Sequence, residues 1–223
     1  MCVIYCSYHT WDICHQGILG CLFKALGMIS GKKTIQKTPQ MPDWIMNGSL
    51  HTKREFLSGL QGGDGCQIRS NKLKSGHNFV CAATSMSKCG EYKQSLVDWM
   101  KDVSILFSEL GIHNKIVELK QQADDRYQLG VKIRDVQENL ISYYETIGYR
   151  YDIRKIENSG VVIDYLKAKK IKTEKRKVYI EQIRQLYDGD YSVEEISTTM
   201  NCKRTYVQDV IRSYKDGRQI SSS

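Results

Sequence analysis

Residues 53–65 read KREFLSGLQGGDG, and this stretch predicts a short helix that ends among glycines around a single acid. Four residues share one face at helical spacing, three of them apolar and one small: Phe56, Leu57, Gly59 and Leu60. Glycine on a packing face lets another backbone approach closely, and the glycines beside Asp64 leave its carboxylate open to a metal ion or a phosphate. The alternative is an ordinary helix C-terminus followed by a turn.

The composition indicates a folded, soluble protein with an anionic partner. The chain has 223 residues, a net charge of +8 and 41% hydrophobic residues, enough for one or two domains with a core. The positive charge suits a partner rich in phosphate, although a ribosomal or membrane-surface role fits the charge equally well. No window reaches the roughly 18–20 uncharged apolar residues of a membrane span.

The cysteines and the N-terminus predict an intracellular protein, in the cytoplasm or the nucleus. The chain has eight cysteines and lacks the basic start of a secretory signal, which most simply means reduced thiols. Several residues that can bind metal gather near the N-terminus, but their spacing matches no established zinc pattern. They are Cys2, Cys6, His9, Cys14 and His15.

A polar hairpin is predicted directly after the glycine-rich end. Residues 66–72 alternate like a strand, residues 72–77 form a turn, and residues 78–87 form a second strand. The hairpin side chains that we expect to contact nucleic acid are Gln67, Arg69, Asn71, Lys72 and Lys74. Gln67, Arg69 and Asn71 share one face of the first strand and could read base edges in a major groove. The alternative is a solvated sheet face.

The middle of the chain repeats this helix-and-hairpin pattern. Apolar residues at helical spacing predict a helix over 92–110, and the spacing predicts another over 136–147. Between them, residues 116–120 and 127–133 alternate like a second pair of strands. The order is helix, two strands, helix, two strands, helix, an αββαββα arrangement of the α+β class.

The C-terminal part predicts a basic connector and a small helical module. The connector covers residues 152–178, and its stretch 167–177 carries seven basic residues and one acid, a net of +6. Such a run is usually a solvated face, but beside other basic surface it can follow a phosphate backbone. Helices at 178–187, 193–200 and 203–214 then resemble a helix-turn-helix, with Ser192 and Glu195 as a capping box. Its last helix would turn four residues toward DNA: Lys203, Arg204, Thr205 and Gln208. Small three-helix units also serve as protein–protein modules.

The nine residues 57–65, LSGLQGGDG, resemble the signature of the LAGLIDADG homing endonucleases. They agree at Leu57, Gly59, Leu60, Asp64 and Gly65, and they differ at Ser58, Gln61, Gly62 and Gly63. The segments PDWI (42–45) and IGYRY (147–151) resemble the intein-type branch of that family. The resemblance implies the family's αββαββα half-fold, in which two such helices pack side by side and each acid holds a divalent ion.

The activity implied by this resemblance is site-specific hydrolysis of double-stranded DNA. Asp64 and Gly63 would bind Mg²⁺ or another divalent cation, and Lys132 would lie near the scissile phosphate. One chain supplies a single acid, so a homodimer through Phe56, Leu57, Gly59 and Leu60 is expected. Two alternatives remain: a catalytically inactive DNA-binding protein or regulator, and an RNA splicing helper.

These predictions divide the chain into four parts. Residues 1–46 form an N-terminal segment that resembles the remnant of a preceding repeat. Residues 47–151 form the endonuclease-like domain, and residues 152–178 form the basic connector. Residues 179–219 form the helix-turn-helix module.

Overall fold

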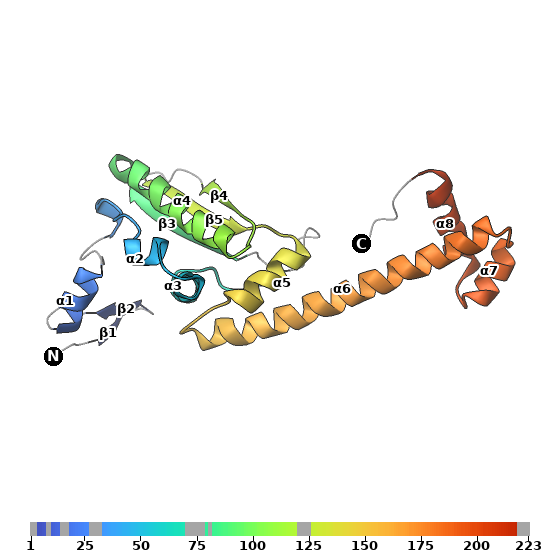
Figure 1. Cartoon of the computed structure of the whole chain (residues 1–223), viewed down its shortest axis with the longest axis horizontal. Helices are drawn as coiled ribbons and strands as arrows, with labels where there is room; N and C mark the ends of the chain where they lie inside the picture. The colour runs from blue at the N-terminus through green and yellow to red at the C-terminus, as the bar shows by residue number, and fades with distance from the viewer. Residues whose placement is uncertain are drawn as a thin grey trace. The chain divides into compact units, whose positions relative to one another are not determined.

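The structure is a computed structural model that describes residues 4–7, 10–13, 18–26, 33–69, 79, 82–119 and 126–217. Contacts divide the chain into two compact units, Met1–Ile163 and Asp164–Ser223 (Figure 1). The division falls inside one long helix, α6 (Ile153–Asp188). No helix in the described part of the chain combines the length and the apolar character needed to cross a membrane.

The first unit mixes helices and strands. Its elements before α6 are β1 (Ile4–Ser7), β2 (Thr10–Ile13), α1 (Ile18–Ala25), η1 (Lys33–Ile35), α2 (Asp43–Met46), α3 (Leu50–Gly63), β3 (Ala83–Cys89), η2 (Gly90–Tyr92), α4 (Lys93–Glu109), β4 (Asn114–Leu119), β5 (Arg126–Ile133) and α5 (Gln137–Thr146). Strands β1 and β2 pair antiparallel, and β3, β5 and β4 form a three-stranded antiparallel sheet in that order.

The core of the first unit lies between this sheet and α4, which crosses the sheet in Figure 1. Alternate residues of β5 point toward the helix and are buried: Leu129, Val131 and Ile133. They meet an apolar stripe of α4 that includes Leu96, Met100, Val103 and Phe107. The described residues of the opposite sheet face are largely polar and include Ser85, Gln128 and Lys132, with the Gln128 amide donating to Ser85 Oγ at 3.1 Å.

Four predicted elements of this unit match the structure. The helices at 92–110 and 136–147 correspond to α4 and α5, and the strands at 116–120 and 127–133 correspond to β4 and β5. The first predicted hairpin differs, because residues 66–69 form no strand. In the described part of this segment, Gly65 bridges Thr84, and the Cys66 N–H donates to the carbonyl of Ala83 at 2.8 Å. One strand is described between α3 and α4, so the complete αββαββα repeat stays a prediction.

The second unit contains the rest of α6 with α7 (Val193–Thr199) and α8 (Arg204–Lys215). One cluster of buried aliphatic side chains holds the three helices together: Ile180, Ile183, Ile196, Val207, Val210 and Ile211. The predicted capping box is confirmed, since Ser192 Oγ accepts from the Glu195 N–H and the Glu195 carboxylate accepts from the Ser192 N–H at 2.8 Å. Asn201 takes a φ of +48° in the turn before α8.

The residues predicted as a connector are helical in this structure. All of them after Asp152 lie within α6, which runs without interruption from Ile153 to Asp188. The segment contains no proline and a single glycine, Gly160, while its many lysines, glutamates and arginines are good helix formers. A charge run therefore marked an exposed helix and not an irregular linker.

Candidate nucleic-acid interface

The tip of α3 is held by a buried lysine. The Lys155 ammonium group, with its side chain 3% exposed, donates to the carbonyl oxygens of Gly62 at 2.7 Å, Gly65 at 2.9 Å and Gln61 at 3.1 Å. The last carbonyls of a helix have no partner within the helix, and a cation also complements the negative end of the helix dipole. Lys155 therefore satisfies this end from α6. Sequence reasoning missed it because its partners lie about 90 residues earlier in the chain.

Asp64 follows the last residue of α3 and is exposed, as is Gly63. The carboxylate is thus accessible, as the sequence predicts. Among the described residues, however, no group of three or more histidine, cysteine, aspartate or glutamate side chains could hold a metal ion. The divalent metal at Asp64 and Gly63 stays a prediction. Of the N-terminal cysteines and histidines, no side chain is described.

The glycine face of α3 packs against the chain's own residues. A Cβ on Gly62 would lie 1.8 Å from the carbonyl oxygen of Arg150, and one on Gly59 would lie 3.7 Å from the Tyr151 ring. The Arg150 N–H also donates to the carbonyl of Ser58 at 3.1 Å. The close backbone approach that the glycines permit is therefore made within one chain, by the segment that leads into α6.

The four residues predicted to join two copies are buried or half-buried within this chain. Leu57 is completely buried, and the Phe56 ring packs edge-on against Trp99 with ring centroids 6.4 Å apart. Gly59 and Leu60 are half-buried. Leu57 and Phe56 thus contribute to this chain's own packing, and a contact between two copies through these four residues stays a prediction.

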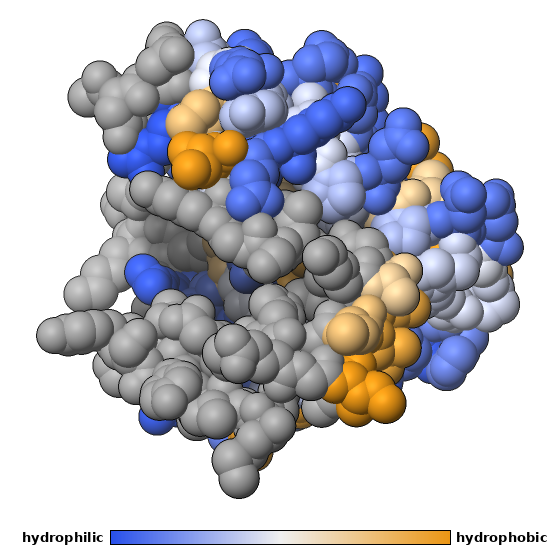
Figure 2. All heavy atoms as spheres, turned by 90° about the vertical axis from the view of Figure 1, so that its left-hand side faces the viewer, coloured by the Kyte–Doolittle hydropathy of each residue, from blue (hydrophilic) through white to orange (hydrophobic). Residues whose placement is uncertain are grey.

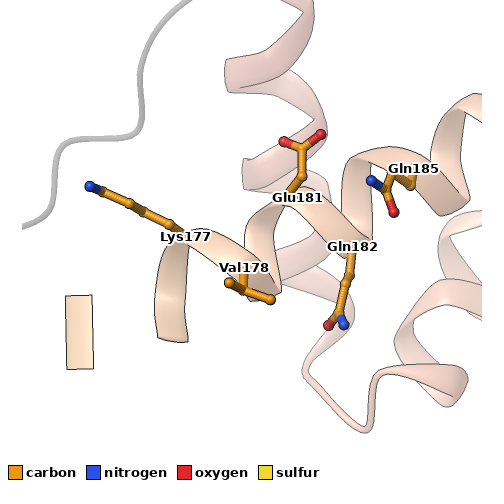
Figure 3. Close-up of a pocket in the computed structure, with 5 residues that line it drawn as sticks. All are labelled: Lys177, Val178, Glu181, Gln182 and Gln185. Carbon is orange, nitrogen blue, oxygen red and sulfur yellow. The ribbon is translucent and has the colours of Figure 1, made fainter. Parts of the chain in front are cut away.

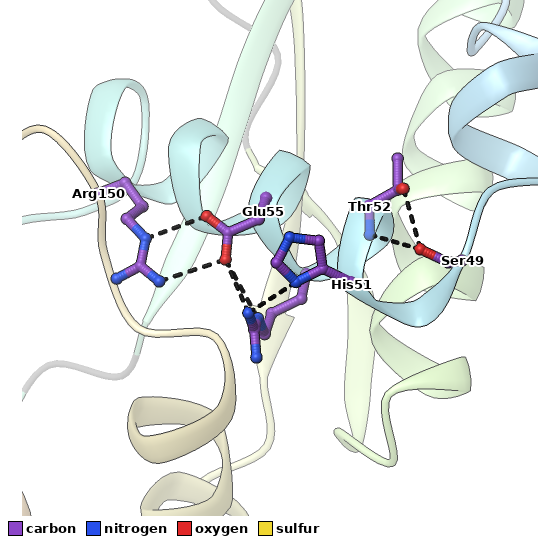
Figure 4. Close-up of polar contacts among 6 residues, drawn as sticks. Ser49, His51, Thr52, Glu55 and Arg150 are labelled. Carbon is purple, nitrogen blue, oxygen red and sulfur yellow. Dashed lines mark hydrogen bonds and ion pairs between the residues drawn. The ribbon is translucent and has the colours of Figure 1, made fainter.

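A charged network covers the outer side of α3 (Figure 4). Arg150 forms a two-pronged ion pair with Glu55, with Nε to Oε2 at 3.1 Å and Nη2 to Oε1 at 3.2 Å. Arg54 reaches the same carboxylate at 3.0 Å and the His51 ring at 2.9 Å. The Arg150 hydrogen bonds, followed by those of Arg54, hold the pKa of Glu55 below its usual value. The network anchors the segment at Arg150 to α3.

The sheet places Lys132 beside a second lysine. Lys132 is half-buried on β5 and lies directly opposite Lys115 on β4 and Ala83 on β3. Because Cys66 bonds to Ala83, Lys132 lies one strand away from the segment that follows Asp64. Like charges directly opposite each other repel, and in the described part of the chain neither lysine has an acidic partner. This pair is suited to an anion.

The predicted nucleic-acid contacts divide into three groups. Gln67 and Arg69 are exposed but lie in irregular structure, so they do not form the predicted row on a strand. Three of the others lie outside the described residues: Asn71, Lys72 and Lys74. The four on the last helix are all exposed at the start of α8: Lys203, Arg204, Thr205 and Gln208. Arg204 is paired with Glu194 of α7 at 2.6 Å.

The basic run forms one part of α6 within the second unit. Its exposed members are Lys167, Lys170, Lys172, Lys175 and Lys177. Lys177 also lines an open hollow of about 530 Å³ with Val178, Glu181, Gln182 and Gln185, and Figure 3 shows its side chain extending away from the other four. On the face shown in Figure 2, the described surface is mainly hydrophilic and its hydrophobic residues form separate patches. The second unit thus offers positive charge on α6 and hydrogen-bonding side chains on α8.

Comparison with known proteins finds relatives of two names. The chain is 29% identical over 195 residues to a tRNA-splicing ligase RtcB of Methanopyrus kandleri, covering 85% of this chain and 19% of that protein. It is 33% identical over 144 residues to the protein of the same name in Pyrococcus abyssi, covering 65% and 15%. A Replication factor C small subunit of Methanocaldococcus jannaschii is 27% identical over 177 residues, covering 78% and 9%. The chain therefore spans less than a fifth of each of these relatives. No family model and no solved structure matches.

These names correct the function predicted from sequence. Most of these relatives are named for RNA ligation, not for a LAGLIDADG homing endonuclease, which overturns the prediction of an endonuclease acting on double-stranded DNA. A ligase is an enzyme, so the relatives' name agrees with an enzyme but not with nuclease chemistry. The physical reason why residues 57–65 predicted the wrong activity lies in what these residues do in the fold. The five agreeing residues serve close helix packing and a glycine-flanked helix end, which do not specify a reaction.

Proposed function

We propose that this chain is an RNA-binding module of an RNA-processing protein, and that its second unit holds the RNA backbone. The observation that carries the proposal is the basic stretch of α6, where seven of the eleven residues from 167 to 177 are lysine or arginine and one is acidic. Five of these side chains are exposed along one continuous helix. Such a helix binds phosphates with little regard to base sequence.

Two lysines of the basic run on α6 are available for a ligand. Lys172 and Lys175 are exposed, and neither has an ion pair or hydrogen bond within the described residues. Each phosphate that they neutralise releases condensed counterions, so binding should weaken steeply as salt rises. The exposed start of α8 adds groups that can reach base edges, of which Gln208 can both donate and accept.

RNA is favoured by the relatives' names. The name tRNA-splicing ligase belongs to whole proteins of which this chain spans less than a fifth. One relative has a different name, that of a replication factor subunit. A segment shared by proteins with such names supports a common property, nucleic-acid binding. The majority of the names concern tRNA, and one of the alternatives from sequence, an RNA splicing helper, agrees with them.

A binding titration tests the proposal. Fluorescence anisotropy would compare a labelled RNA stem-loop, the DNA stem-loop of the same sequence and a DNA duplex over a series of KCl concentrations. We expect the RNA to bind most tightly, and the double variant Lys172→Gln/Lys175→Gln to lower the slope of log K against log salt by about 1–2. That change should weaken RNA binding several-fold at low salt.

The matched control is Lys37→Gln/Lys101→Gln, which removes the same charge from exposed positions of the first unit. It should leave the affinity for RNA close to that of the unmodified chain. Equal losses in the two double variants would show a response to net charge alone and would contradict a binding surface on α6. Tighter binding of the DNA duplex than of the RNA would contradict the choice of ligand.

A further inference from the structure

Tyr151 is held in an unfavourable backbone conformation while its ring faces solvent. Its side chain is 93% exposed, and its φ is +64°, in the left-handed region that bulky L residues rarely adopt. A Cβ on Gly59 of α3 would lie 3.7 Å from the ring. Neither core packing nor local backbone preference explains a tyrosine at this position, where asparagine or glycine would fit more easily. Strained residues of this kind cluster at binding sites.

The backbone around Tyr151 is fixed on both sides. On the preceding side, Arg150 is tied to Glu55 by its ion pair and to the carbonyl of Ser58 by its N–H. On the following side, the Asp152 carboxylate accepts from the Lys155 N–H at 3.1 Å and begins α6. The exposed ring is therefore presented in a defined place, without the loss of freedom that a flexible loop would suffer on binding.

The residues after Tyr151 add an exposed cation and an exposed apolar side chain to the exposed ring. Arg154 is exposed and has no ion pair or hydrogen bond among the described residues, and Ile153 is 73% exposed. An aromatic face for a base, with a cation nearby for its phosphate, is how proteins hold unpaired nucleotides. We propose that Tyr151 stacks on an unpaired base of the bound RNA while Arg154 contacts the adjacent phosphate. This inference rests on the proposed RNA-binding function and places a second contact in the first unit.

Three variants of the full chain test the stacking role. Tyr151→Phe keeps the ring, whereas Tyr151→Asn removes it and suits the left-handed backbone. The probe is a short single-stranded RNA carrying one 2-aminopurine, whose fluorescence is quenched when the base stacks. We expect Tyr151→Phe to bind and quench like the unmodified chain. Tyr151→Asn should lose affinity roughly 5- to 150-fold and abolish the quenching. Its midpoint of urea unfolding should equal or exceed that of the unmodified chain. Trp44→Ser, which removes a half-exposed aromatic elsewhere in the first unit, should change neither affinity nor quenching.

The outcomes separate this inference from the function on which it rests. If the unmodified chain binds RNA and loses affinity on Lys172→Gln/Lys175→Gln but not on Tyr151→Asn, the stacking role is overturned and the proposed function stands. If the unmodified chain binds no RNA, both are overturned. A loss of affinity in Tyr151→Phe as large as in Tyr151→Asn would show that the hydroxyl and not the ring is responsible, which also overturns stacking.

Discussion

At the scale of single residues, two neighbouring glycines of α3 have opposite surroundings. A Cβ on Gly62 would enter the backbone carbonyl of Arg150, whereas a Cβ on Gly63 would meet no atom within 4 Å. Both are at the end of the same helix, so their intrinsic effect on the helix is similar. The difference between them arises only from the segment that crosses at Arg150.

Alanine at these two positions gives a matched test of that contact. Gly62→Ala should destabilise the first unit by about 1–3 kcal/mol, because a backbone carbonyl cannot move aside cheaply. Gly63→Ala should be neutral or stabilise the helix by up to about 1 kcal/mol. Urea unfolding followed by circular dichroism measures both. Equal stability of the two variants would show that Arg150 does not pack on α3 as described.

At the scale of elements, the helices of the second unit depend on how their ends are satisfied. In the capping box at the start of α7, the side chains of Ser192 and Glu195 each accept a hydrogen bond from the other residue's backbone N–H. Ser192 Oγ also donates to the Glu195 carboxylate at 2.7 Å. The bond from the Ser192 side chain, followed by that from its backbone N–H, lowers the pKa of Glu195 below its usual value. The charged form of Glu195 is therefore favoured in the folded state.

This linkage predicts how the second unit responds to acid. A carboxyl whose folded pKa is lowered contributes stability above its unfolded pKa, about 4.3 for glutamate, and loses that contribution as the pH falls through the folded pKa. Glu195→Gln keeps an acceptor for the cap but does not titrate. Between about pH 7 and about pH 3, the variant should thus lose less stability than the unmodified chain in urea unfolding. An identical pH dependence in both proteins would argue against the capping box.

At the scale of the whole molecule, the described residues include two separate clusters of buried side chains. The first lies between the sheet and α4 and includes Val131, and the second joins α6, α7 and α8 around Ile183. Both residues are completely buried. Units with their own cores can unfold in separate transitions, and we expect the two units of this protein to do so.

Reciprocal core variants test this independence. Ile183→Ala should destabilise the second unit by about 2–5 kcal/mol and reduce the protection of α8 amides from hydrogen exchange, while β5 keeps its protection. Val131→Ala should show the opposite pattern. Hydrogen exchange read by mass spectrometry reports both regions in one experiment. Equal loss of protection in both units from either variant would show a single cooperative core.

Local patterns predicted much of the fold, because they depend on residues close in sequence. Helical spacing of Leu96, Met100 and Val103 was sufficient to place α4, and alternation placed β4 and β5. Ser192 and Glu195 specified the start of α7. Alternation failed at Gln67 and Arg69, which lie in irregular structure, because a strand also needs a pairing partner. At the candidate site, the exposed residues at the start of α8 were found, but Lys155 and Tyr151 were not.

The sequence by itself determined where most helices and strands lie, the positive charge of α6 and the glycine-flanked end of α3. Each of these follows from hydrophobic period, charge or backbone freedom within a few residues. Only the tertiary structure decided what packs on α3, because Arg150 and Lys155 reach it across about 90 residues of chain. The tertiary structure also revealed the strained backbone of Tyr151. A positive φ and an unpacked ring are set by contacts on either side and leave no local sequence pattern.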